Sequence, residues 1–402
     1  MKIHPLISDS KPLAELCDRF KDADFVAVDT EFMRENTYYP DLCLVQISDG
    51  KEAAAIDPKA DGIDLDPLLD LLCENEDVLK IFHAGGQDIE IFFNMSGKTP
   101  HPMFDTQIAA MALGQGEQIG YSNLVDLWLG VHLDKGARFT DWSRRPLDKR
   151  QIDYAIGDVT HLSEIFPRML DKLRDTGRGG WLNDEMERIS DADNYRNDPE
   201  KSWERVKIQS RKPDVLGRLQ AIAAWREREA QHKDIPRGRI MKDETMADIA
   251  SHPPKAQEGL GKIRGLSAAW KNNEIGARLM QIIRDAKPLD RPHNGRGRRS
   301  NGGKEGQLVA DLLKLLLKIR SREINVASRL ICKTDELERL AAGEREGLRV
   351  LTSWRFEQFG SDALDLVEGR LGFTVVDGKL KMMRNAEGVG TERTDDAETT
   401  DA

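Results

Sequence analysis

The spacing of hydrophobic positions changes near residue 180 and divides the chain into two kinds of structure. Before that point, the β-branched, alternating run Phe25–Asp29 predicts a strand, and the mainly apolar runs Leu42–Ser48, Glu52–Ile56 and Leu79–His83 predict three more. Apolar residues at helical spacing predict helices at Asp88–Phe93, Thr106–Leu113 and Leu147–Leu173, the last interrupted near Pro167. Asp49 and Gly50 are typical of a hairpin turn. A hairpin followed by helices predicts a mixed sheet flanked by helices.

Beyond residue 180 the pattern predicts helices alone, in two similar all-α regions. In each, a long amphipathic helix precedes a polar cap and a second amphipathic helix. The matching stretches are Trp225–Glu229 with Lys242–Ala250, and Arg320–Glu323 with Lys333–Ala341. Duplicated helical modules explain this pattern, and chance similarity between amphipathic helices is the alternative.

Shifts in composition mark the expected boundaries. Residues 287–304 are rich in Gly, Pro and Arg, which predicts a flexible basic linker and, secondarily, a strip that contacts phosphates. We expect a first domain at 1–175, a helical linker at 176–211, the two modules at 212–286 and 305–383, and a disordered acidic tail at 384–402.

Overall composition limits the class of protein. The chain has 402 residues, 39% of them hydrophobic, and no apolar run near the roughly 20 residues that span a bilayer. It lacks a secretory signal at its start, and its four cysteines are scattered, so we expect a cytoplasmic protein with reduced thiols and no membrane partner. The net charge of −10 does not itself indicate nucleic-acid binding, but local basic clusters decide that property. Nothing in the sequence demands more than a monomer.

Four acidic residues in three stretches carry the candidate chemistry. Asp29 and Glu31 lie two apart on a predicted strand, so both side chains share one face. Asp88 follows Gly85 and Gly86 at a helix start, where a helix-capping role is the alternative. Tyr154 and Asp158 lie four apart and therefore on one helix face, and a surface pair is the alternative there. Carboxylates beside a buried strand need neutralising partners, and divalent cations are suitable ones.

The three stretches, in this order, resemble the exonuclease motifs of the DEDD superfamily, which has an α/β ribonuclease H-like fold. The Tyr154-x-x-x-Asp158 spacing is similar to that of the tyrosine subclass. Further stretches resemble the ribonuclease D family, namely Thr30–Glu35, Leu44–Ile47, Phe104–Gln107 and Thr140–Leu147. The helical repeats resemble that family's two HRDC domains, the second less closely than the first.

The resemblance implies a metal-dependent 3′–5′ exoribonuclease that releases nucleoside 5′-monophosphates and trims tRNA precursors and other structured RNAs. It implies two Mg²⁺ or Mn²⁺ ions held by Asp29, Glu31, Asp88 and Asp158, while Tyr154 positions the attacking water. Because a phenol with a reference pKa near 10 is a poor base at neutral pH, we favour orientation over proton abstraction for Tyr154. A DNA 3′–5′ exonuclease and a catalytically inactive RNA-binding protein are the alternatives.

Further residues are weaker candidates for substrate contacts. By analogy with the family, Phe32, Met33 and Gln46 would line the pocket for the terminal nucleotide, with core packing an equal alternative for the first two. Arg144 and Arg145 would hold a backbone phosphate, or else form a solvated basic patch. At His83 we favour a packed core histidine over a substrate contact. We interpret Asp105 as a supporting or helix-capping residue, and Trp142 as structural.

Overall fold

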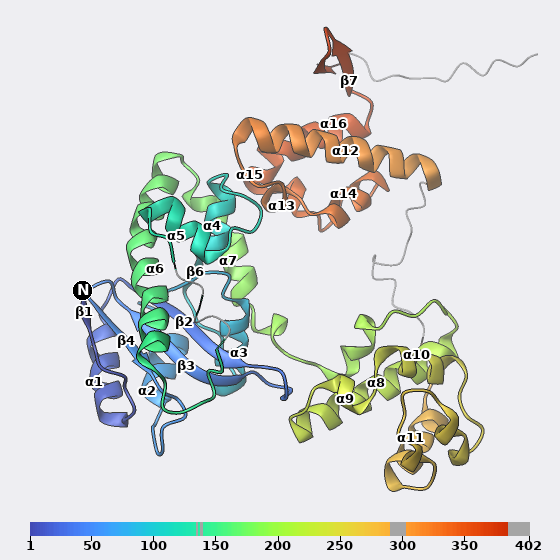
Figure 1. The fold of residues 1–402 in the computed structure, drawn as a ribbon. Helices are drawn as coiled ribbons and strands as arrows, with labels where there is room; N and C mark the ends of the chain where they lie inside the picture. The colour runs from blue at the N-terminus through green and yellow to red at the C-terminus, as the bar shows by residue number, and fades with distance from the viewer. Residues whose placement is uncertain (134–135, 137–139, 290–302, 385–402) are drawn as a thin grey trace, which may run out of the picture. The chain divides into compact units, whose positions relative to one another are not determined.

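A computed structural model describes residues 1–133, 136, 140–289 and 303–384 (Figure 1). The chain divides into two compact units. One contains Met1–Gln107 and Gly120–Asn294, and the other contains Ile108–Ile119 and Gly295–Ala402. Most of the predicted basic linker, 290–302, and nearly all of the predicted acidic tail, 385–402, lie outside the described residues.

A six-stranded mixed sheet is formed by the first 105 residues of the chain. Its strands are β1 (Lys2–Ile3), β2 (Phe25–Met33), β3 (Asp41–Ser48), β4 (Glu52–Ile56), β5 (Leu79–Phe82) and β6 (Met103–Asp105). Their order is β1-β4-β3-β2-β5-β6. The β4–β3 and β3–β2 pairs are antiparallel, whereas β1–β4, β2–β5 and β5–β6 are parallel. The predicted mixed sheet is therefore confirmed, and the predicted hairpin is the β3–β4 pair.

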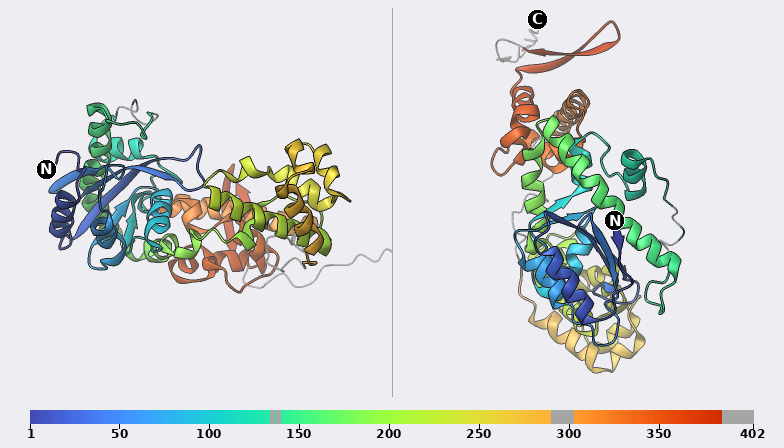
Figure 2. Two further views of the ribbon diagram at one scale, coloured as in Figure 1. Left: turned by 90° about the horizontal axis from the view of Figure 1, so that it is seen from below. Right: turned by 90° about the vertical axis from the view of Figure 1, so that its left-hand side faces the viewer.

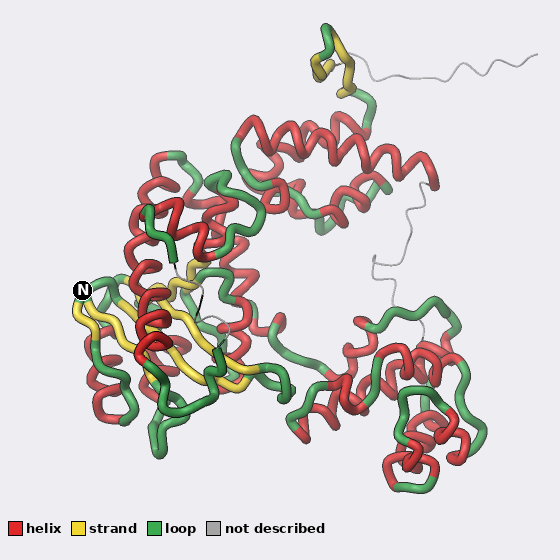
Figure 3. The backbone as a smooth tube through the Cα atoms, viewed as in Figure 1, coloured by secondary structure: helices red, strands yellow, loops and turns green. Residues whose placement is uncertain are grey.

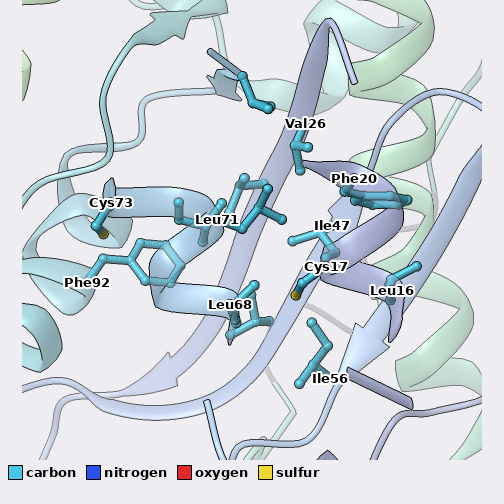
Figure 4. Close-up of a cluster of buried hydrophobic side chains, with 14 of the residues drawn as sticks. Leu16, Cys17, Phe20, Val26, Ile47, Ile56, Leu68, Leu71, Cys73 and Phe92 are labelled. Carbon is cyan, nitrogen blue, oxygen red and sulfur yellow. The ribbon is translucent and has the colours of Figure 1, made fainter. Parts of the chain in front are cut away.

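Side chains alternate along β2, so that one face of the strand packs into the core and the other carries the acids. Val26 and Val28 point into a core formed with α1 (Ser10–Phe20), α2 (Asp66–Leu69), the adjoining π-helical turn Asp70–Glu74 and α3 (Gly86–Ser96) (Figure 4). Asp29 and Glu31 point to the opposite face. That face is covered by α6 (Lys149–Asp175), which lies beside the sheet in the right-hand view of Figure 2.

The long helix α6 begins at a reciprocal cap. The Asp148 side chain accepts the backbone N–H of Gln151 at 2.8 Å, and the Gln151 side chain accepts the backbone N–H of Asp148 at 3.1 Å. The predicted interruption near Pro167 is wrong, because the helix continues through it. Pro167 removes one backbone hydrogen bond, but its neighbours Phe166 and Met169 are buried and hold that turn against the sheet.

Two helical modules follow, and each begins with a long helix, a one-turn helix and a third helix (Figure 3). The first comprises α8 (Pro213–Lys233), α9 (Arg237–Ile240), α10 (Asp243–Ser251) and α11 (Glu274–Asp285), and the second comprises α12 (Gly303–Ile324), α13 (Ser328–Ile331), α14 (Thr334–Ala341), α15 (Ser353–Arg355) and α16 (Ser361–Val367). The first three helices of each module begin 90 or 91 residues apart, at 213 and 303, 237 and 328, and 243 and 334, whereas the later elements do not follow this offset. Left-handed residues at 234 and 325 follow the long helices, and extended residues at 241 and 332 end the one-turn helices. This regularity favours duplication over chance similarity.

The second helical region ends in strands, which corrects the expectation that it is wholly α-helical. Strands β7 (Leu371–Val376) and β8 (Lys379–Arg384) pair as an antiparallel hairpin. Asp377 and Gly378 both adopt positive φ, as a two-residue hairpin turn requires. The Asp-Gly signal was therefore present in the sequence.

Shorter elements complete the part of the first unit that precedes the modules. Among them are α5 (Tyr121–Leu129) and α7 (Asn183–Ser190), while α4 (Thr106–Ala112) spans the boundary between the two units. All four cysteines are buried free thiols. Across the described residues, we find no helix with the length and apolar character needed to cross a membrane.

Candidate active site

Three carboxylates meet where α6 crosses β2. Asp29 and Glu31 project from one face of β2, and Asp158 projects from the buried side of α6. One oxygen from each lies within 4.8 Å of the other two. Residues 127 positions apart in the chain are thus brought together by the packing of one helix on one strand.

Burial and the neighbouring acids both act on the Asp29 carboxylate. Desolvation, followed by the charges of Asp158, Asp88 and Glu31, raises the pKa of Asp29 well above its usual value. Three clustered oxygen donors of this kind are the ligands that Mg²⁺ and Mn²⁺ prefer. The donor set therefore fits a divalent cation, whose charge would relieve the repulsion between the carboxylates.

Asp88 approaches the same site from the other face of the sheet. It lies in the first turn of α3, is buried, and its Oδ1 accepts a hydrogen bond from the Thr30 hydroxyl. Thr30 lies between Asp29 and Glu31 on β2 and points away from them. Burial raises the pKa of Asp88 to about 7, and the charge of Asp105 contributes in the same direction. Asp88 is therefore a neighbour of Asp29 but is not one of the three residues that cluster within 4.8 Å.

A tight turn at Ala84 and Gly85, just before α3, positions Asp88 beside Asp29. The carboxylate of Asp105 accepts the backbone N–H groups of Ala84 at 3.1 Å and Gly85 at 3.0 Å, and also caps α4 through Gln107 at 2.8 Å. Ala84 has a positive φ of 56°, an unusual conformation for alanine. A Cβ on Gly85 would lie 2.5 Å from the Cβ of Phe82, so this position requires glycine.

Tyr154 lies one helical turn before Asp158, as its spacing predicts. It is half-buried, and its ring packs against that of Trp142, with centroids 6.3 Å apart. Trp142 is only 2% exposed. The packing limits the rotation of the Tyr154 ring beside the carboxylates.

Tyr121, the first residue of α5, is a further site residue that could not be identified from its sequence pattern. Its hydroxyl donates to the backbone carbonyl of Asp158, and its ring lies 5.5 Å from that of His83, centroid to centroid. Desolvation and the charges of Asp158 and Asp29 raise the pKa of Tyr121 well above its usual value, so it remains a donor. A tyrosine directly after a glycine is too common a pattern to have identified it.

His83 and Gln46 both lie close to the acids. His83 Nδ1 is 3.0 Å from the Thr106 hydroxyl, which in turn donates to the Phe82 carbonyl. Gln46 pairs with Asp29 across the β2–β3 ladder but is fully buried, and neither polar atom of its side chain has a hydrogen-bond partner. In this conformation its side chain is not exposed to a nucleotide.

Phe32 and Met33 end β2, just past the acids, and both are partly exposed. A bulge in the β2–β3 pairing between Glu31 and Phe32 changes the direction of the side chains that follow it. Their position beside the cluster is compatible with the predicted nucleotide pocket and with packing.

Arg145 corrects one prediction. All five of its N–H donors are engaged, because it pairs with both oxygens of Asp57 at 2.6 Å and donates to the carbonyls of Cys43, Trp142 and Arg144. It therefore ties residues 142–145 to the sheet and has no donor left for a phosphate. Arg144, in contrast, has a side chain that is 83% exposed and a loose 3.5 Å ion pair with Asp141.

The fold and the carboxylate site define a ribonuclease H-like 3′–5′ exonuclease. Residues 5–174 match a family described as a 3′-5′ exonuclease, and residues 215–283 match the HRDC domain. The chain is 69% identical to Ribonuclease D of Sphingobium indicum over 96% of its own length and 100% of that protein. It is 60% identical to Ribonuclease D of Zymomonas mobilis over 95% of its length and 98% of that protein.

The structure is likewise similar to that of Escherichia coli RNase D, described as an exoribonuclease involved in structured RNA processing. The TM-score is 0.78 at 26% sequence identity, covering 90% of this chain and 98% of that one. The chain belongs to the ribonuclease D family of 3′–5′ exoribonucleases. The predicted family and enzyme class are confirmed, and neither alternative function is favoured.

Proposed function

We propose that this exoribonuclease uses two divalent ions, Mg²⁺ or Mn²⁺, to release nucleoside 5′-monophosphates from RNA 3′ ends. The observation that carries the proposal is the meeting of Asp29, Glu31 and Asp158 within 4.8 Å, with Asp88 alongside. Asp29, at the centre of the acid set, would contribute to both ions, Glu31 and Asp158 to one, and Asp88 to the other. Bound divalent ions supply an activated water and stabilise the departing 3′ oxygen.

Two tyrosines would orient the attacking water and the acid Asp158. Tyr154, whose ring packs on Trp142, would hydrogen-bond the attacking water and hold it in line with the scissile phosphate. Tyr121 fixes the backbone of α6 at Asp158. The buried side of α6 and the sheet exclude bulk water from one side of the cluster, which strengthens the electrostatic interactions there.

For substrates, we propose 3′-end trimming of tRNA precursors and other structured RNAs by a cytoplasmic monomer. The described role of the Escherichia coli relative in structured RNA processing supports this substrate class. The second helical module is proposed to be another HRDC domain, because its first three helices follow those of the matched module at an offset of 90 or 91 residues. Both modules and exposed Arg144 would extend the contact with RNA beyond the terminal nucleotide.

The test is the incubation of 5′-labelled single-stranded RNA, and of DNA with the same sequence, with the protein in Mg²⁺, Mn²⁺ or EDTA. We expect stepwise shortening of the RNA, release of nucleoside 5′-monophosphates and no reaction in EDTA. Release of nucleoside 3′-monophosphates, or activity that survives EDTA, would contradict the proposal. Equal or faster cleavage of DNA would contradict the substrate assignment.

A further inference from the structure

The first helical module holds the loop that follows the catalytic strand. Residues 34–40 connect β2, which carries Asp29 and Glu31, to β3. This loop enters a corner between α8 and α9. At that corner Asp234 adopts a left-handed conformation, with φ of 46°, and its Oδ1 accepts the backbone N–H groups of Tyr38 at 2.9 Å and Tyr39 at 3.0 Å.

The side chain of Tyr38 completes this contact. Its hydroxyl donates to Glu227, which is fully buried, and Tyr38 itself is only 6% exposed. Arg237 lies over the Tyr38 ring, 5.9 Å from its centroid, and pairs with Glu227 at 3.5 Å. A carboxylate without solvent depends strongly on such partners, so removal of one donor perturbs the whole corner.

The beginning of the same loop is fixed to the catalytic domain. Both terminal nitrogens of Arg34, the residue after β2, pair with the Glu90 carboxylate at 2.7 Å. Glu90 lies on α3, two residues after Asp88. The loop is therefore held by α3 at its start and by the helical module at its middle, with the last acid of β2 three residues away.

The corresponding corner in the second unit also makes hydrogen bonds, but there the module is the donor. Asn325, which is 91 residues after Asp234, also adopts a positive φ, and it lies so close to Gly114 that a Cβ there would be 2.5 Å away. The backbone N–H of Ala327 donates to the Met111 carbonyl at 2.9 Å, and that of Ser328 donates to Glu117 at 2.8 Å. Residues 108–119 belong to the segment matched as a 3′-5′ exonuclease. The equivalent corner of each module thus contacts a different segment of the exonuclease domain.

We propose that this corner is an intramolecular docking surface, and that through Tyr38 the first module positions the acids of β2 for catalysis in addition to any binding of RNA. The inference rests on the exonuclease activity but goes beyond it. It makes Tyr38 a positioning residue, since its hydroxyl contacts Glu227 and not the reacting atoms. It also predicts that loss of this contact reduces turnover even when the substrate is too short to reach the module.

The test compares Tyr38→Phe and Glu227→Gln with the wild type on a trinucleotide and on a long RNA. Glu229→Gln is the matched control, because Glu229 lies on the same helix but pairs within the module, with Lys233 and Arg278. We expect Tyr38→Phe to lower kcat on the trinucleotide five- to tenfold, with KM within twofold. Glu227→Gln should act in the same direction, and Glu229→Gln should stay within twofold of wild type.

The Mg²⁺ concentration that gives half the maximal rate separates positioning from a loss of folded protein. If the acids are displaced in Tyr38→Phe, this Mg²⁺ concentration should rise at least threefold. Partial unfolding would instead lower the rate and leave this Mg²⁺ concentration unchanged. Wild-type kcat and Mg²⁺ dependence on the trinucleotide would overturn the inference, even if affinity for the long RNA fell. Failure of the wild type to cleave the trinucleotide would count instead against the proposed function.

Discussion

Replacement of Asp105 by alanine should destabilise the turn that places Asp88 in the active site. Asp105 is 3% exposed, and its carboxylate accepts three backbone N–H groups, from Ala84, Gly85 and Gln107. The first two form the turn before α3, so they connect Asp105 with the start of the helix that carries Asp88. Ala84 keeps its unfavourable positive φ only while this turn is held.

The expected magnitude follows from the burial of the three donors. A hydrogen bond to a charged group contributes roughly 1.5–3 kcal/mol. Gly85 is buried and would lose its partner entirely, whereas water can reach the N–H groups of exposed Ala84 and partly exposed Gln107. We therefore expect Asp105→Ala to lower the free energy of unfolding by about 3 kcal/mol. Asp105→Asn should cost less, because one oxygen remains as an acceptor.

The assay combines urea unfolding in EDTA with the rate of RNA cleavage. Asp105→Ala should lower kcat at least tenfold and raise the Mg²⁺ concentration needed for half the maximal rate, since Asp88 is displaced. Wild-type stability would refute the assigned hydrogen bonds. Reduced stability with unchanged kcat and unchanged Mg²⁺ dependence would refute the link from Asp105 to Asp88.

Three further outcomes follow from the structure. Gly85→Ala should destabilise the protein, because its Cβ would clash with Phe82. Ala84→Gly should raise the free energy of unfolding in urea by up to about 1 kcal/mol, because glycine adopts positive φ without strain. A stabilising Gly85→Ala or a destabilising Ala84→Gly would contradict the described turn. Arg145→Lys should lower Tm without changing KM for RNA, because Arg145 holds Asp57. Arg144→Ala should raise KM at low salt only, because Arg144 is exposed. A higher KM in Arg145→Lys, or a lower Tm with unchanged KM in Arg144→Ala, would contradict these roles. Burial lowers the pKa of fully buried Lys80 to about 8, below its unfolded value near 10.4. Between these two pKa values the unfolded chain binds more protons than the folded chain. The free energy of unfolding of the wild type, relative to that of Lys80→Met, should therefore rise by about 3 kcal/mol from pH 8 to 10.5. A difference between the two proteins that stays constant over this range would refute the lowered pKa.

The parts of the site that depend on local periodicity could be predicted from the sequence. The two-residue spacing of Asp29 and Glu31 places them on one face of a strand, and the four-residue spacing of Tyr154 and Asp158 places them on one face of a helix. The structure has both arrangements. The resemblance to a known family, rather than periodicity, led us to expect that these two faces meet.

Contacts between distant parts of the chain could not be predicted in this way. The partner of Arg145 is Asp57, 88 residues earlier, so an arginine that resembled a phosphate ligand is a structural tie. Tyr121 reaches the Asp158 carbonyl only because α5 packs beside α6. Strands β1 and β6, of two and three residues, are too short to produce a detectable alternation.

The central claim is that the carboxylates gathered around Asp29 hold the divalent ions that drive RNA cleavage. Calorimetric titration with Mn²⁺, paired with single-turnover cleavage by the same samples of wild type and Asp29→Asn, tests it most directly. We predict that Asp29→Asn keeps the fold, as judged by circular dichroism, but loses both tight Mn²⁺ binding and at least a thousandfold of the cleavage rate. Cleavage at the wild-type rate by Asp29→Asn would contradict the account.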